Sequence, residues 1–460
     1  MLPAWIDTAR ALIAADTSPG HGTRAAAEIL APLYRAAGLT VQVDPVGDDD
    51  INVIASRPES GDALLLVTHL DTVPTGPKEL WTRGDPHTLT VDGDTAYGLG
   101  TADVKLDALA KALAAARFTN TKLARPFHLL GTFGEEVGLR GAKRFVTHGA
   151  FKPRWVACGE PSELRVINAH KGYCVVRARV RDRAARAIET PETDLLTFDG
   201  RAAHSSTPAL GVNAIEKAVA FALQTSASIV AVEGGTAANM IPSRCTLTVG
   251  APFERRSAIV PDFARPGSLR TDRPKNLWRA LATGASALTD LWRQLAQDLS
   301  PSEDARFSPP GAVANVTLIS SGADFVEVTL DARLLPTHDP DALCTSFASR
   351  AQAWADRLGD GALDVTVTVD RSNAGMALPA TALLAQAAGR AARTLKLDPT
   401  PLAKPTSTEA GIFSRAGAEA IVFGAGRSTG NAHCANEHTS LSQLERAVDF
   451  YEQLIRELCA

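Results

Sequence analysis

The chain has 460 residues, a length that favours two or more domains. Its 47 basic and 51 acidic residues leave a formal net charge of −4, which offers no general attraction for a nucleic acid or an anionic membrane, so neither is expected as a partner. With 45% hydrophobic and 21% charged residues, the composition is that of a globular protein and excludes disordered and fibrous classes.

The cysteines and the N-terminus bear on the compartment. None of the six cysteines forms a C-x-x-C pair, and they are too sparse for a disulfide scaffold. The first 20 residues carry charges at helical spacing and lack a basic segment followed by an apolar one, so no secretory signal is expected. No uncharged apolar run approaches the roughly 18 residues of a spanning helix. We therefore expect a cytoplasmic protein with reduced thiols.

The first part of the chain has the pattern of an α/β fold. Helices are predicted over 3–15 and 23–37, the second ending at Gly38 as helices commonly do. Short apolar runs typical of buried parallel strands lie at 52–56, 63–68, 126–132, 155–158 and 420–423. In open α/β sheets the ligand site lies beyond the carboxyl ends of the strands, so functional residues are expected there.

The middle of the chain has a different texture. Alternating polar and apolar residues at 174–180 and 324–333 predict half-exposed antiparallel strands. We expect an inserted α+β domain of 172–370, with an extra segment at about 251–313 around one amphipathic stretch, 276–299.

Helical patterns at 381–395 and 441–458 then predict a return to the first domain. That domain would comprise 1–171 and 371–460 and contain a mixed, mostly parallel sheet flanked by helices.

Metal-ligand residue types follow the predicted strands. His69 and Asp71 end the run LLLVTHLD, where a neutral imidazole can bind a metal and a nearby carboxylate can orient it. Asp103 follows the glycine-rich turn YGLGTAD, although by itself it is more simply a cap of the helix predicted over 104–116. A histidine after a strand is also most often structural, so neither motif decides the function alone.

Further ligand types come later in the chain. Glu135 and Glu136 follow the strand in GTFGEEVG, Glu160 follows the strand in WVACGEP, and GNAHCANEH supplies His433 and His438. Glutamates on a solvated loop are the simpler interpretation of each motif alone. Together, however, five strand ends or turns on one edge of the sheet each offer a metal ligand. Two histidines and three carboxylates suffice for two zinc-type ions that share a bridging carboxylate and a bridging water.

With these motifs, the sequence resembles the dinuclear zinc metallopeptidase and amidohydrolase family that contains acetylornithine deacetylase, succinyl-diaminopimelate desuccinylase, aminoacylase and glutamate carboxypeptidase. The matching stretches keep the family's order between about residues 65 and 440: THLDTVP, GLGTADVK, GTFGEEVG, CGEP, HSSTPALGVNAIEKA, NMIP and AHCANE. The resemblance implies a zinc-exopeptidase-like catalytic domain with an inserted lid or dimerisation domain.

The resemblance also implies a ligand set. His69 and Glu160 would bind one metal ion, Glu136 and His433 would bind the other, and Asp103 would bridge the two. Zinc is the expected metal, with cobalt or manganese as alternatives.

Other residues carry roles over from the family in the same way. Glu135 would be the general base, and Asp71 the carboxylate that orients the first histidine ligand. His204 resembles the lid histidine that stabilises the oxyanion, a group that typically contributes about a hundred- to thousandfold in rate. Asn239 of NMIP resembles a residue that binds the substrate carboxylate. Arg371 is a second candidate for that task, although a solvated arginine is an equally good interpretation.

The chain departs from the common family pattern in three places. ADVKLDA has Leu106 and Asp107 where many members have glycines, and KPTSTEAGIF has Glu409 where many have aspartate, a form closer to acetylornithine deacetylases. The inserted domain is much larger than a minimal dimerising lid. Two states are therefore expected as alternatives: a homodimer, or a monomer in which the enlarged lid replaces the partner.

The implied function is a metal-dependent hydrolase that cleaves the amide bond of a small N-acyl amino acid by attack of a metal-bridging water. A metallodipeptidase or carboxypeptidase with the same site is the alternative, because the sequence does not show the acyl pocket that separates them. A non-catalytic binding protein on the same fold is a third interpretation. The complete ligand set that the resemblance implies, together with Glu135, argues against it.

Overall fold

The computed structural model describes residues 3–183, 193–224, 229–250, 277–298, 303–357 and 363–460. The extra segment expected at about 251–313 is therefore described in part, since 251–276 and 299–302 lie outside these residues. The chain forms two compact units: unit 1 is Met1–His170 with Gly375–Ala460, and unit 2 is Lys171–Ala374. Among the described residues, no helix has the length and apolar character needed to cross a membrane.

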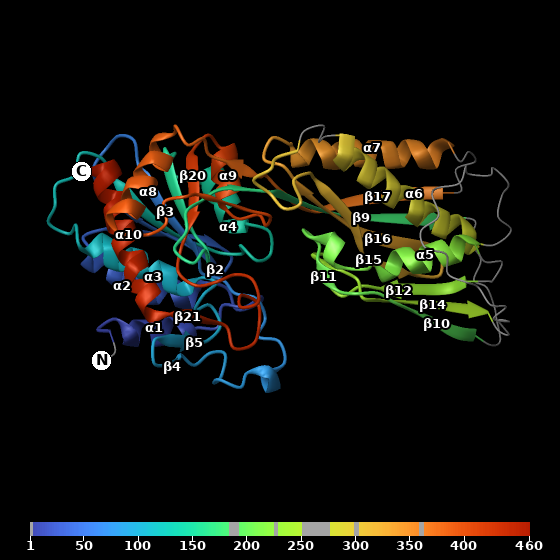
Figure 1. The fold of residues 1–460 in the computed structure, drawn as a ribbon, viewed down its shortest axis with the longest axis horizontal. Helices are drawn as coiled ribbons and strands as arrows, with labels where there is room; N and C mark the ends of the chain where they lie inside the picture. The colour runs from blue at the N-terminus through green and yellow to red at the C-terminus, as the bar shows by residue number, and fades with distance from the viewer. Residues whose placement is uncertain (1–2, 184–192, 225–228, 251–276, 299–302, 358–362) are drawn as a thin grey trace. The chain divides into compact units, whose positions relative to one another are not determined.

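Unit 1 is built on a nine-stranded mixed sheet with the order β1-β2-β6-β3-β7-β20-β8-β18, and β19 pairs with β8 (Figure 1). Its strands are β1 (Thr40–Val46), β2 (Asp50–Ser56), β3 (Leu64–His69), β6 (Phe127–Thr132), β7 (Trp155–Gly159), β8 (Ile167–His170), β18 (Met376–Ala377), β19 (Leu402–Lys404) and β20 (Glu419–Phe423). The central strands β6, β3, β7 and β20 run parallel, so their carboxyl ends meet at one edge.

One strand direction differs from the expectation. The run at 52–56 was predicted to be a parallel strand, but β2 pairs antiparallel with β6. The connection to β3 explains the difference, because only residues 57–63 join the two strands. A parallel connection needs a crossover of about a dozen or more residues.

Helices cover both faces of the unit 1 sheet. One face carries α1 (Ile6–Ala14), α2 (Arg24–Ala36), α3 (Lys105–Ala116), α8 (Leu383–Thr394) and α10 (Leu441–Cys459), and the other carries α4 (Arg140–His148) and α9 (Ala410–Arg415). Side chains alternate along β3: Leu64 and Leu66 join the first core, and Leu65 and Val67 join the second. Because both faces are buried, the strand is apolar without interruption.

A small three-stranded sheet fixes the C-terminal loop of unit 1. It contains β4 (Thr90–Asp92), β5 (Thr95–Tyr97) and β21 (His438–Ser440), in the order β21-β5-β4. The pairing of β21 with β5 brings the loop before β21 beside the turn that follows β5. A short 3₁₀ turn, η1, spans Lys78–Leu80.

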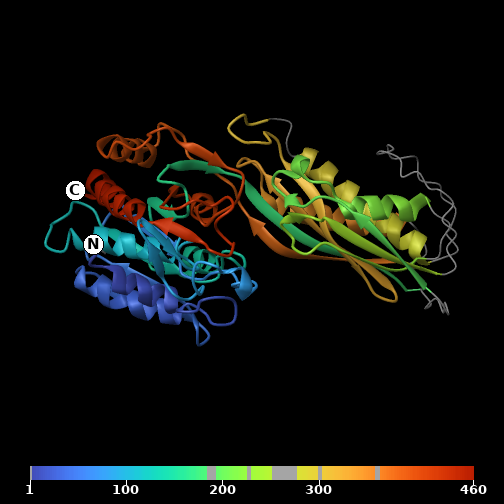
Figure 2. The same cartoon turned by 60° about the horizontal axis from the view of Figure 1, so that its bottom comes forward.

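Unit 2 contains a seven-stranded antiparallel sheet in the order β10-β14-β12-β15-β16-β9-β17. Its elements are β9 (Gly172–Asp182), β10 (Thr193–Asp199), β11 (Ala203–His204), η2 (Pro208–Leu210), α5 (Ala214–Gln224), β12 (Ile229–Gly234), β13 (Met240–Ile241), β14 (Arg244–Gly250), α6 (Leu277–Asp298), β15 (Val313–Ser321), β16 (Phe325–Leu334), α7 (Pro340–Arg357) and β17 (Leu363–Asn373). The helices α5, α6 and α7 pack on one face of this sheet. Figure 2 shows the green helix α5 and the yellow helix α6 along it. The helix α6 agrees with the amphipathic stretch expected at 276–299.

The core of unit 2 lies between this sheet and its helices. On β9, the inward side chains Val176 and Ala178 alternate with the outward Arg177 and Arg179, as the half-exposed pattern predicted. Trp292 of α6 is fully buried. Its indole N–H donates to the carbonyl oxygen of Asp331 at 2.7 Å, and its ring meets Phe347 edge-on with centroids 5.1 Å apart.

We expect Trp292→Ala to destabilise unit 2 by about 3–5 kcal/mol, because the change removes a fully buried indole and leaves a cavity. Leu195→Ala on β10 is the control. That side chain is 65% exposed, so its loss should change stability by less than about 0.5 kcal/mol. Urea unfolding followed by circular dichroism measures both variants. Equal, small effects would contradict the packing described for Trp292.

Candidate metal centre

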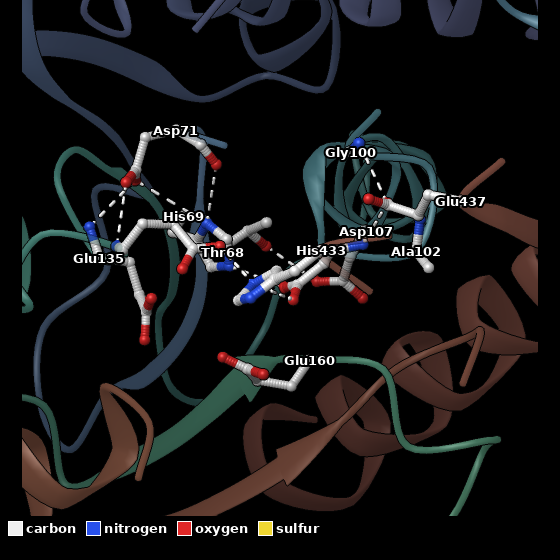
Figure 3. Close-up of polar contacts among 12 residues, drawn as sticks. Thr68, His69, Asp71, Gly100, Ala102, Asp107, Glu135, Glu160, His433 and Glu437 are labelled. Atoms are coloured by element: carbon white, nitrogen blue, oxygen red, sulfur yellow. Dashed lines mark hydrogen bonds and ion pairs between the residues drawn. The ribbon is translucent and has the colours of Figure 1, made fainter. Parts of the chain in front are cut away.

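The ends of three parallel strands bring metal-ligand side chains to one edge of the unit 1 sheet. His69 is the last residue of β3, Glu135 and Glu136 lie just beyond β6, and Glu160 directly follows β7. Since β6, β3 and β7 are parallel neighbours, these residues gather at the same carboxyl edge. Figure 3 shows His69, Glu135 and Glu160 there.

Two loops supply the remaining residues. Asp103 lies in the turn before α3, and His433 lies in the loop between β20 and β21. The glycines of YGLGTAD are needed for this turn. Gly100 has φ +85°, and a Cβ there would lie 2.5 Å from Cε of Lys105. At this φ any other L residue would be strained, so glycine suits the turn that carries Asp103.

The carboxylate of Asp103 lies between the two imidazoles. Its Oδ1 is 3.1 Å from Nε2 of His69, and its Oδ2 is 3.2 Å from Nε2 of His433. The same nitrogen of His433 lies 2.9 Å from Oε1 of Glu136. One carboxylate thus faces both histidines, one oxygen to each, which is the arrangement that a bridging ligand requires.

Ligand atoms within 4.8 Å of one another form two groups that share Asp103. One contains His69, Asp103 and Glu160, and the other contains Asp103, Glu136 and His433. These are the two ligand sets that the resemblance implies. A third group joins His69 with Glu135 and Glu136.

The electrostatics of the site fit divalent cations. Burial, reinforced by neighbouring carboxylates, raises the pKa of Glu135 well above its usual range. Burial and the nearby Asp103 also raise the pKa of Glu160, although Lys404 opposes them with Nζ 3.3 Å from Oε2. So many carboxylates in a largely buried space destabilise one another, and bound metal ions would remove that penalty. The nitrogen and oxygen donor set is one that zinc accepts.

Asp71 holds the turn that carries the glutamates. Its Oδ1 accepts the backbone N–H of Glu135 and its Oδ2 accepts that of Glu136, both at 3.0 Å. Its carboxylate was expected to orient His69, but it lies 3.8 Å from Nδ1 of that ring. The backbone carbonyl oxygen of Asp71 is nearer to Nδ1, at 3.0 Å. Asp71 therefore contacts both strand ends, one through its backbone and one through its side chain (Figure 3).

The other predicted site residues belong to unit 2. His204 lies on β11, with Nδ1 2.7 Å from the hydroxyl of Ser206. The pairing of His204 with Met240 places Asn239 on the adjacent segment. Arg371 lies on β17, with its guanidinium carbon 5.7 Å from the ring centroid of Tyr173. Their functional roles stay predictions.

The sequence reasoning missed a buried cation in unit 2. Arg333 is 3% exposed and stacks on Tyr173 at 3.5 Å from the ring centroid. It donates to the hydroxyl of Ser205 at 3.1 Å, and its Nε lies 3.4 Å from Oδ2 of Asp331. An arginine inside the apolar run of DARLLP was the available signal.

His438, the histidine not chosen as a ligand, belongs to a different environment. Its Nδ1 lies 2.9 Å from the carbonyl oxygen of Asn436, and its ring packs against Tyr97 with centroids 5.3 Å apart. Among the described residues, it is in none of the candidate ligand groups. Its neighbour Glu437, the last residue of the motif AHCANE, is 1% exposed.

A mixed sheet with clustered ligands at its carboxyl edge, in a chain that also contains an α+β unit, defines a class of protein: the metal-dependent amidohydrolases and peptidases. The sequence model of Peptidase family M20/M25/M40 matches residues 65–457, and the chain belongs to this family. The resemblance seen in the motifs is thereby confirmed.

Relatives of known name share part of the chain. The acetylornithine deacetylase of Vibrio atlanticus (strain LGP32) is 34% identical over 221 residues, 47% of this chain and 53% of the relative. That of Klebsiella pneumoniae (strain 342) is 36% identical over 224 residues, with the same two shares. The chain thus spans about half the length of the curated relatives it matches.

Solved structures are similar over nearly the whole chain. The aminoacylhistidine dipeptidase of Vibrio alginolyticus has a TM-score of 0.66 at 16% identity, with 99% of this chain and 96% of that chain covered. An M20 family metallo-carboxypeptidase from Sulfolobus solfataricus has a TM-score of 0.60 at 17% identity, with 99% of each chain covered. These likenesses confirm the predicted fold class.

Metal binding should release protons. Burial lowers the pKa of His433, but hydrogen bonds to Asp103 and Glu136 outweigh this effect and raise the pKa to about 11 in the metal-free protein. The imidazole is therefore protonated at pH 7. A metal ion that binds Nε2 must displace this proton, and affinity should therefore rise with pH up to about that value.

We expect Zn²⁺ added to chelator-treated protein at pH 7 to raise Tm and to release protons. Calorimetric titrations in two buffers of different ionisation enthalpy measure the release. His433→Ala should release fewer protons than the parent. Equal release from the two proteins would exclude His433 as a ligand.

Proposed function

We propose that this protein hydrolyses the amide bond of small N-acyl amino acids, as the names of its acetylornithine deacetylase relatives suggest. The observation that carries the proposal is the placement of Asp103 between His69 and His433, with Glu135 at the end of the adjacent strand. The family membership and the ligand geometry are independent observations, and both favour metal-dependent hydrolysis.

In this proposal the two ligand groups hold two divalent ions, with zinc as the expected metal. His69 and Glu160 hold one, Glu136 and His433 hold the other, and Asp103 is shared. Zinc ions at such a site lower the pKa of a bound water toward about 7 and polarise the substrate carbonyl.

Glu135 is the proposed general base. It is largely buried, and its backbone N–H is fixed by the carboxylate of Asp71. Burial raises the pKa of Glu135, which suits a carboxyl group that takes a proton from the attacking water and later returns it to the leaving amine. Its neighbour Glu136 contacts His433 instead. In this proposal, Glu135 transfers the proton and Glu136 binds metal.

Residues of unit 2 would complete substrate binding. We propose His204 as the donor to the oxyanion and Asn239, with Arg371, as partners of the α-carboxylate. Ser206 supports His204, since its hydroxyl contacts Nδ1 and so holds the imidazole within its loop. Arg333 is a further candidate for the carboxylate, because it is the buried guanidinium that contacts Ser205 beside His204.

The general base has a direct test. Glu135→Gln should lower kcat by at least about a hundredfold, the typical contribution of a positioned acid or base, while metal content and Tm stay near the parent values. Glu28→Gln on the exposed side of α2 is the matched control and should keep full activity. Steady-state kinetics and metal analysis measure the outcome. Retained activity in Glu135→Gln would remove this residue from its proposed role.

A substrate panel tests the class of amide. We expect turnover of at least one compound among N-acetylornithine, N-succinyl-diaminopimelate and other N-acetyl amino acids, and loss of that turnover on chelation. Dipeptides are the alternative substrates. Turnover of dipeptides alone would replace the deacylase proposal with a metallodipeptidase, and metal binding without any hydrolysis would favour a non-catalytic binding protein.

A further inference from the structure

A buried glutamate outside the ligand set joins the two loops that carry Asp103 and His433. One oxygen of Glu437, Oε1, accepts three backbone N–H groups: Gly100 at 3.0 Å, Ala102 at 2.9 Å and Asp103 at 3.0 Å. Figure 3 labels Glu437 with Gly100 and Ala102. The backbone carbonyl oxygen of Glu437 also accepts the N–H of Gly98 at 2.9 Å. The turn that carries Asp103 is therefore bound by one residue at four points.

The loop that carries His433 is held by a neighbour of Glu437 in the sequence, Asn436. Its conformation is unusual, because His433 has φ +60° and Asn436 has φ +63°. The side chain of Asn436 accepts the N–H of Arg83 at 2.8 Å and donates to the carbonyl oxygen of Leu80 at 3.2 Å. These contacts anchor the loop against the segment around residue 80, and Glu437 adds the contact to the Asp103 turn.

The position of Asp103 between His69 and His433 depends on the contact between Glu437 and the Asp103 turn. Asp103 must place one oxygen at each imidazole, at 3.1 and 3.2 Å, yet it lies in a turn with no regular secondary structure. His433 comes from a loop more than 300 residues away in the chain. From the His433 loop, the carboxylate of Glu437 reaches the backbone of the Asp103 turn, and Glu437 is 1% exposed.

We propose that Glu437 is a positioning residue for the metal centre: by accepting the three N–H groups of the Asp103 turn, it sets the distance between Asp103 and His433 and thereby the affinity for metal. This inference rests on the proposed function only for the identity of the metal ligands. Residues that support ligands in this way typically contribute about 10- to 100-fold in metal affinity.

The test compares three variants in the full-length protein. Glu437→Asp shortens the side chain by one methylene, so the oxygen no longer reaches the three N–H groups. Glu437→Gln keeps an acceptor oxygen at the same length. Asp94→Asn is the matched control: Asp94 accepts the N–H of Ser442 at 2.9 Å and so holds the nearby start of α10, but it does not contact the Asp103 turn in the described structure.

Zn²⁺ affinity is measured by competition with a chelator, and Tm is measured with and without Zn²⁺. We expect Glu437→Asp to bind Zn²⁺ at least tenfold more weakly and to show a smaller Zn²⁺-induced rise in Tm, with Glu437→Gln within about threefold of the parent and Asp94→Asn unchanged. A purely structural role would lower Tm with and without metal and leave the affinity unchanged.

Two results would overturn the proposal. Parent-like affinity in Glu437→Asp would show that the contacts do not set the ligand geometry. Equal weakening in Glu437→Asp and Glu437→Gln would assign the effect to the negative charge instead of the hydrogen bonds.

If Glu437→Asp does not fold, hydrogen exchange of the metal-free parent decides: strong protection of the peptide spanning 98–103 is expected, and fast exchange would overturn the proposal. A parent that binds Zn²⁺ but hydrolyses none of the panel would refute the proposed function and leave this inference standing.

Discussion

The crowding of negative charge at the carboxyl edge of the unit 1 sheet is the constraint on which the rest of the site depends. Five carboxylates gather around two imidazoles: Asp71, Asp103, Glu135, Glu136 and Glu160. Buried like charges oppose ionisation unless donors or cations compensate them. Lys404 compensates Glu160 in part, and metal ions at the shared ligand groups would compensate the others. The fold must hold these groups together against their mutual repulsion until metal binds.

Two carboxylates accept backbone N–H groups and so hold the segments that carry the metal ligands in place. Asp71 accepts the N–H groups of Glu135 and Glu136, and Glu437 accepts those of the turn that ends at Asp103. In both cases a buried acid fixes the chain that carries a ligand. Backbone N–H donors stabilise a carboxylate without adding a mobile side chain, so the geometry of the ligands is set by the main chain.

The sequence was sufficient for the parts of the site that follow strands. An apolar run that stops at a histidine or an acid is a local pattern, and parallel pairing brings such ends to one edge, which is why His69, Glu135 and Glu160 could be named. The predicted parallel direction of β2 was wrong, because strand direction depends on the length of the connection to the next strand as well as on apolar content.

Other features depend on contacts that are distant in sequence. The contact of Glu437 with Gly100 joins segments more than 300 residues apart, and no local pattern marks it. Arg333 was missed because the sequence at 324–333 alternates polar and apolar residues as a half-exposed strand does, whereas most of β16 is buried. The pattern does not show that the arginine is stacked on Tyr173 and buried.

The segment ADVKLDA, which departs from the common family pattern, contains a buried acid that supports the strand carrying His69. Asp107, where many relatives have glycine, is 3% exposed at the start of α3. Its Oδ2 lies 2.6 Å from Nζ of Lys111 and 2.8 Å from the hydroxyl of Thr68, the residue before His69. A buried ion pair is costly to desolvate, and it is tolerated when further hydrogen bonds satisfy both groups.

Further hydrogen bonds satisfy both Asp107 and Lys111, and the neighbouring strand β7 leaves room for the Asp107 carboxylate. The hydroxyl of Tyr451 on α10 donates to Oδ1 of Asp107 at 2.5 Å, and Lys111 also donates to Thr68 at 2.8 Å. A Cβ on Gly159 of β7 would lie 2.0 Å from Oδ2 of Asp107, so a glycine in the strand makes room for the carboxylate on the helix. The pair therefore ties α3 and α10 to the end of β3, and it steadies the strand that presents His69 without contacting the metal ligands themselves.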